Sequence, residues 1–154
     1  MAVLGVISSG DLHIPKEAYM ATVYKEFIVN ASPDFVWEAI RDVGAVHTRL
    51  AQGFVTNTLL SGDTRTVTFS NGFVVREQII TISDELRRLS YTAIGGTASH
   101  HNAYFQVSGT AEGKARVLWV TDILPEDVRA PIAQMVDSGS AAIQQTLERL
   151  FRGV

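Results

Sequence analysis

The residues from Pro125 to Arg152, PEDVRAPIAQMVDSGSAAIQQTLERLFR, carry apolar side chains at steps of three and four. This spacing places the apolar side chains on one stripe of a long helix, with polar residues mostly on the opposite side. Pro131 lacks a backbone donor, so we expect regular helix from about Ala130, after a looser turn from Glu126. The stripe consists of Val128, Ile132, Met135, Val136, Ala142, Ile143, Leu147 and Leu150.

A helix of this length is stable in water only when its apolar stripe is covered, and the preceding sequence supplies a cover. Most of it alternates apolar and polar residues, which is typical of strands. Ser32-Pro33 is a helix start, and a second short helical turn is expected at 46–50. We therefore predict an α+β fold, in which a seven-stranded antiparallel sheet wraps around the long C-terminal helix, with two short helices after the first strand. The expected strands are 20–29, 54–60, 65–70, 73–82, 87–94, 101–108 and 116–124.

For two strands, the turns beside them predict which side chains point to the inner face of the sheet. A last turn centred on Glu112 places Phe105 opposite Trp119 and His101 near Ile123, on the inner face. The strand at 73–82 leaves two alternatives. A strict two-residue turn at Asn71-Gly72 puts Arg76 on the side of Val67, whereas one extra residue there puts Glu77 inside.

The chain has 154 residues, a formal net charge of −3 and no cysteine. This length predicts one domain, and the charge argues against a nucleic-acid partner. No apolar run reaches the roughly 20 residues that span a bilayer, so no membrane insertion is expected. The short run Val3–Ile7 has no preceding Lys or Arg, so we expect no signal peptide and a soluble cytoplasmic protein. Residues 1–18 show no regular spacing of apolar residues and are predicted to be an extension of a domain at 19–154.

The order of predicted elements, together with several local motifs, resembles the SRPBCC superfamily. This is the START-related helix-grip group, which includes polyketide cyclase/dehydrase-like proteins, pollen-allergen-type carriers and plant hormone receptors. The resemblance covers roughly residues 19–151. The motifs that carry it are SPDFVWEAIRD (32–42), VREQ (75–78), DELRRLSY (84–91), Gly95-Gly96, AYFQV (103–107), Trp119 and Pro125.

The resemblance implies a deep, largely apolar cavity between the sheet and the long helix. It favours the turn with one extra residue, and thus Glu77 inside. The loop at Gly95-Gly96-Thr97 is located where related receptors carry a mobile lid. By position, the residues that resemble the family's cavity lining are Glu77, Tyr91, Ala103, Phe105 and Trp119.

Two ionisable residues are candidates for chemistry. Glu77 inside an apolar cavity can act as a general base or anchor a polar ligand, or it can be a structural carboxylate. His101 can take or give a proton near neutral pH, or simply line the cavity through a hydrogen bond. His100 points to the opposite face, and a metal would need His47 or Glu77 as a further ligand, so no metal site and no cofactor are expected.

Several other residues are predicted to shape the cavity. Tyr91 and Trp119 can stack on a ring or fill the core. Gly139 lies on the apolar stripe of the helix, where it leaves room for a ligand or lets the helix approach the sheet closely. The full predicted ligand-binding set is Trp37, Phe69, Glu77, Tyr91, His101, Phe105, Trp119, Met135 and Gly139.

Three functions remain open at this point. The leading one is binding of a small hydrophobic molecule, either lipid-like or an aromatic polyketide-like compound. The second is a cyclase or dehydratase that uses Glu77 or His101 as general acid or base. The third is a regulatory or structural partner domain whose outer sheet face carries Leu118, Val120 and Leu124. Because contiguous apolar surface is usually covered, we expect either the N-terminal extension or the second subunit of a homodimer to lie on this face.

Overall fold

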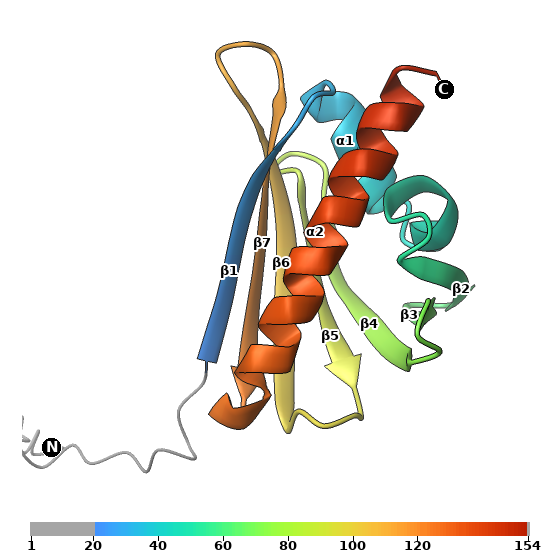
Figure 1. Cartoon of the computed structure of the whole chain (residues 1–154), viewed down its shortest axis with the longest axis vertical. Coiled ribbons are helices and arrows are strands. Elements are labelled where there is room, and N and C mark those ends of the chain that lie inside the picture. The colour runs from blue at the N-terminus through green and yellow to red at the C-terminus, as the bar shows by residue number, and fades with distance from the viewer. Residues whose placement is uncertain (1–20, 154) are drawn as a thin grey trace, which may run out of the picture.

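The computed structural model describes residues 21–153. One antiparallel sheet, with the strand order β1-β7-β6-β5-β4-β3-β2, curves around a long C-terminal helix (Figure 1), which confirms the predicted helix-grip architecture. The predicted extension, residues 1–18, lies outside the described residues. The elements are β1 (Ala21–Val29), α1 (Pro33–Arg41), η2 (Val46–Leu50), β2 (Val55–Ser61), β3 (Thr64–Phe69), β4 (Val74–Ser83), β5 (Arg88–Ile94), β6 (His100–Gly109), β7 (Ala115–Leu124), η3 (Glu126–Val128) and α2 (Arg129–Phe151).

The two short helices begin where their sequence predicts. The Ser32 hydroxyl accepts a hydrogen bond from the Phe35 amide at 3.2 Å, and Pro33 occupies the first helical position of α1. Both features satisfy or remove backbone donors that the first turn of a helix leaves unpaired. After Gly44 the chain forms η2, a single π-helical turn that buries Val46 and Leu50.

The turn between β3 and β4 contains three residues rather than two. The Phe69 amide donates to the Phe73 carbonyl at 2.8 Å, and Gly72 has a positive φ of 86°. Such a turn with a left-handed glycine places one extra residue beside the hairpin. As a result Arg65 pairs with Glu77 and Val67 pairs with Val75, so that Glu77 faces inward.

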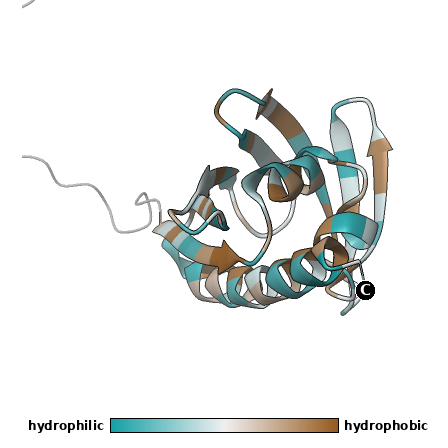
Figure 2. Ribbon diagram, turned by 90° about the horizontal axis from the view of Figure 1, so that it is seen from above, coloured by the Kyte–Doolittle hydropathy of each residue, from teal (hydrophilic) through white to brown (hydrophobic). Residues whose placement is uncertain are grey.

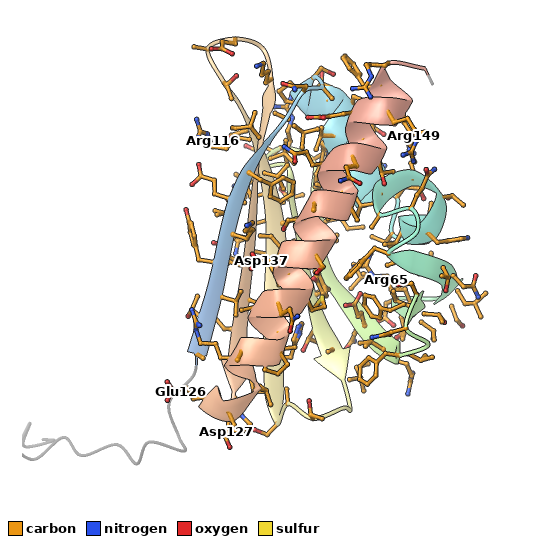
Figure 3. All side chains as sticks on the ribbon, viewed as in Figure 1. Arg65, Arg116, Glu126, Asp127, Asp137 and Arg149 are labelled. Atoms are coloured by element: carbon orange, nitrogen blue, oxygen red, sulfur yellow. The ribbon has the colours of Figure 1, made fainter. Side chains whose placement is uncertain are left out.

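The helix α2 crosses the concave face of the sheet and packs mainly against β1 and η2 (Figures 1 and 2). Polar contacts hold it on both sides. Asp137, labelled in Figure 3, pairs with Lys25 of β1 at 3.0 Å, and the Thr146 hydroxyl accepts from the Gln52 amide at 3.0 Å. Its apolar stripe buries Val136, Ile143 and Leu147 in the core.

The outer face of β7 is covered in part by its own sheet. Val120 is only 7% exposed, and it lies between Tyr24 of β1 and Tyr104 of β6 in the strand register. Among residues 21–153, no helix has the length and apolar character needed to cross a membrane.

Candidate functional site

A cavity of about 550 Å³ opens at one end of the helix-grip fold. Three segments form its walls: the β3–β4 hairpin, the end of β5 with the loop that follows it, and η3 with the N-terminal half of α2. Val75, Ile132 and Met135 contribute apolar side chains to these walls. The volume lies within the range of about 300–1,000 Å³ that is typical of small-molecule sites.

The deep end of the interior is nearly filled. A void of only about 60 Å³ remains there, lined by Tyr91, Phe105, Trp119 and Gly139. The Phe105 and Trp119 rings stack with centroids 4.6 Å apart, and Trp119 Nε1 donates to the Tyr91 hydroxyl at 3.0 Å. A Cβ atom at Gly139 would lie 3.1 Å from Trp119 Cζ3, so this glycine lets helix and sheet approach closely.

Glu77 forms a buried ion pair with Arg65 where the cavity meets this deep end. Arg65 Nε lies 2.8 Å from Glu77 Oε1, and the two side chains are 4% and 13% exposed. The guanidinium also lies over the Tyr91 ring, 5.0 Å from its centroid (Figure 3 labels Arg65). Burial, reinforced by the nearby Glu77 carboxylate, raises the pKa of Tyr91 well above its ordinary value, so this hydroxyl stays neutral.

His101 is held in one tautomer by an unusual contact between β5 and β6. The backbone pairing of these strands ends at Tyr91 and Ala103. Beyond it, the Ala93 amide donates to His101 Nδ1 at 3.0 Å, and the Thr92 hydroxyl donates to the His101 carbonyl. Because Nδ1 accepts a hydrogen bond, the neutral ring carries its proton on Nε2. Burial lowers the pKa of His101, although the Glu77 carboxylate acts in the opposite direction.

The structure divides the predicted ligand-binding residues into three groups. Phe69, Glu77, His101 and Met135 line the open cavity and also the deep void. Tyr91, Phe105, Trp119 and Gly139 line the deep void only. Trp37 lines neither of these two spaces.

The indole of Trp37 is engaged at the other end of the sheet. Trp37 Nε1 donates to Asp84 Oδ1 at 2.9 Å, and Arg41 Nε binds the same carboxylate oxygen at 2.8 Å. Its place on the apolar side of α1 buries the ring but does not direct it to the cavity. Its role here is to join α1 to the β4–β5 turn.

Sequence reasoning did not identify Arg65 or the part of the cavity wall at Val75. The inward position of Arg65 follows from the β3–β4 turn, because the pairing that places Glu77 inside also places Arg65 directly opposite it. Among residues 21–153, no three His, Asp or Glu side chains converge as a metal site would require.

The fold and its cavity define a helix-grip domain of the general ligand-binding kind. The chain belongs to the family described as polyketide cyclase/dehydrase and lipid transport, whose sequence model matches residues 20–152. No curated protein matches the sequence significantly.

Solved structures with the same fold are distant in sequence. An uncharacterized protein from Bacillus thuringiensis has a TM-score of 0.74 at 18% identity, covering 82% of this chain and 98% of its own. The protein XoxI from Bacillus cereus has a TM-score of 0.72 at 19% identity, with coverages of 86% and 96%. Truncated norcoclaurine synthase from Thalictrum flavum has a TM-score of 0.67 at 21% identity, with coverages of 86% and 93%.

The Arg65–Glu77 pair predicts a strongly non-additive pair of substitutions. Arg65→Met should lower the free energy of unfolding by about 3 kcal/mol, because it leaves the Glu77 charge buried without its partner. The double variant Arg65→Met/Glu77→Leu should recover most of that loss. Urea denaturation at neutral pH measures both, with the exposed neighbour substitution Arg76→Met as the control. If the double variant loses as much stability as Arg65→Met and Glu77→Leu lose when their separate effects are added, the pairing is contradicted.

His101 predicts a specific dependence of stability on pH. Its pKa in the folded state lies below the ordinary 6.5, so folding favours the neutral ring. The corresponding stability is present in full above that ordinary value and is lost as the pH falls toward the folded pKa. The difference in unfolding free energy between the wild type and His101→Gln should therefore shrink as the pH falls below about 6.5. A difference that stays constant or grows on acidification would refute this assignment.

Proposed function

We propose that this domain binds a small hydrophobic molecule, lipid-like or aromatic, in the cavity between the β3–β4 hairpin and α2. The observation that carries the proposal is a cavity of about 550 Å³ whose walls include Val75, Ile132 and Met135 together with two ionisable side chains, Glu77 and His101. Burying apolar surface drives such binding, while a few placed polar groups orient the ligand.

The distribution of open volume supports a position for the ligand in the outer part of the cavity. The stacked floor of Phe105 and Trp119 is already packed, so the ligand body occupies the outer cavity, against Val75, Ile132 and Met135. Its inner end then meets Glu77 and His101, which line both spaces. Tyr91, Phe105 and Trp119 serve as the rigid floor that supports these two groups rather than as direct contacts.

The comparisons support this proposal at the level of ligand class. The family description includes both polyketide enzymes and lipid transport. Norcoclaurine synthase from Thalictrum flavum, 22% identical with a TM-score of 0.61 and coverages of 80% and 86%, has been solved in complex with dopamine and hydroxybenzaldehyde. Ligands with a single aromatic ring are thus accommodated on the same fold in a distant relative.

A second candidate is an enzyme that removes a proton next to a carbonyl group. In the tautomer that the Ala93 hydrogen bond selects, His101 presents Nε2–H, which donates a hydrogen bond and does not accept a proton. This arrangement leaves Glu77 as the base and His101 as the donor to the substrate carbonyl oxygen. Glu77 Oε1 is engaged by Arg65, so the base would act through Oε2.

The binding proposal predicts that filling the cavity abolishes ligand uptake. Val75→Trp, or Ile132→Trp from the opposite wall, should weaken binding of the neutral fluorescent probe N-phenyl-1-naphthylamine at least tenfold, because the indole occupies the ligand's volume. Ile80→Trp on the same strand is the control, since Ile80 is 54% exposed outside the cavity. Circular dichroism confirms folding. Unchanged probe affinity in both cavity variants would exclude this cavity as the site.

The enzyme alternative predicts exchange of carbon-bound protons in a cavity ligand. With 2-acetonaphthone in D₂O, the wild type should accelerate deuterium incorporation at the methyl group, and Glu77→Gln should abolish the acceleration while binding persists. Proton NMR follows the exchange directly. An exchange rate equal to that of buffer, with the ketone bound, would eliminate proton abstraction from this ketone and leave binding as the function.

A further inference from the structure

Two side chains of opposite hydrogen-bonding character, Glu77 and His101, line both the open cavity and the deep void. Glu77 has one carboxylate oxygen, Oε1, bound to Arg65, which leaves Oε2 without a protein partner among residues 21–153. His101 has Nδ1 bound to the Ala93 amide, which leaves Nε2–H as its remaining polar group. Both side chains line the open cavity and the deep void, and the Glu77 charge acts directly on His101.

This pair offers an acceptor and a donor on the wall that the open cavity shares with the deep void. Each is oriented by a second contact, Glu77 by Arg65 at 2.8 Å and His101 by Ala93 at 3.0 Å, so neither turns freely to suit a ligand. A buried polar group that loses water without gaining a partner costs about 1–3 kcal/mol. A good ligand must therefore satisfy both atoms.

We propose that the cavity selects ligands that enter with an uncharged hydroxyl group, a phenol or an alcohol, at their inner end. This inference rests on the proposed binding function and adds the chemistry of the ligand's polar end. A hydroxyl group both donates and accepts, so one oxygen can give its proton to Glu77 Oε2 and accept from His101 Nε2–H. The apolar remainder of the ligand then lies along Val75, Ile132 and Met135.

Other polar groups fit this arrangement less well. An ether or ketone accepts from His101 but leaves Glu77 Oε2 desolvated and unpaired. A carboxylate accepts from His101 but is repelled by Glu77, and the compensating charge of Arg65 is already engaged. An ammonium group suits Glu77 but meets the N–H of His101, a donor facing a donor. The Tyr91 hydroxyl oxygen accepts from Trp119 in the deep floor, and its own O–H group is a further donor there.

The test compares three naphthalenes of nearly equal shape by isothermal titration calorimetry on the full chain near pH 7. These are 2-naphthol, which donates and accepts, 2-methoxynaphthalene, which only accepts, and 2-naphthoate, which is anionic. 2-Naphthol should bind about tenfold more tightly than either, the effect of one hydrogen bond to a charged group. This ligand comparison in the wild type needs no variant and decides the proposal by itself.

Variants of His101 test whether this residue causes the preference for 2-naphthol. His101→Phe should remove most of the preference for 2-naphthol, and His101→Gln, whose side chain keeps an N–H donor, should retain part of it. Asn102→Ala, the exposed neighbour on the outer face of β6, should leave it unchanged. A preference that survives in full in His101→Phe would overturn the assignment to this pair.

The outcomes separate this inference from the function on which it rests. If the methoxy compound and the naphthol bind equally and Val75→Trp blocks both, the hydroxyl preference is wrong and the cavity function stands. Tighter binding of 2-naphthoate than of 2-naphthol would likewise refute the hydroxyl preference and leave the cavity function standing. If none of the three binds, the proposed function fails and the inference fails with it.

Discussion

The interior of this protein depends on the alternation of side chains along β4, and that alternation is set by the β3–β4 turn. Successive residues of a strand face opposite sides, so a shift of one residue exchanges every inward side chain for an outward one. The three-residue turn at Gly72 directs Glu77 inward opposite Arg65 and leaves Arg76 exposed. A two-residue turn would instead bury Arg76 and leave Arg65 without a carboxylate in its own layer.

The pairing of Arg65 with Glu77 also keeps this part of the interior electrically neutral. A carboxylate inside an apolar space is costly unless a partner and hydrogen bonds compensate for its lost hydration. Arg65 provides both, since its Nε binds Glu77 and its guanidinium lies over the Tyr91 ring. His101 remains a neutral ring because burial disfavours its charge. The cavity thus presents fixed dipoles and one compensated charge pair.

Packing divides the space beneath α2 into a solid floor and an open mouth. Gly139 brings the helix close enough to touch the Trp119 ring, and this contact fills the deep half. Toward the mouth, β5 and β6 separate after Tyr91 and Ala103, and the loop beginning with Gly95 forms part of the cavity wall. A rigid floor below an open mouth is the arrangement in which a small number of polar groups can orient a ligand.

The sequence by itself determined the order of elements, the cap at Ser32 and the pairing of Phe105 with Trp119, because each depends on neighbours or on one turn. It also placed Glu77 and His101 among the candidates, though the inward facing of Glu77 needed the family resemblance. The tertiary structure alone decided that Arg65 neutralises Glu77, that Trp37 lies outside the cavity and that the space next to Gly139 is filled. These outcomes depend on distances between segments far apart in the chain, which local periodicity does not encode.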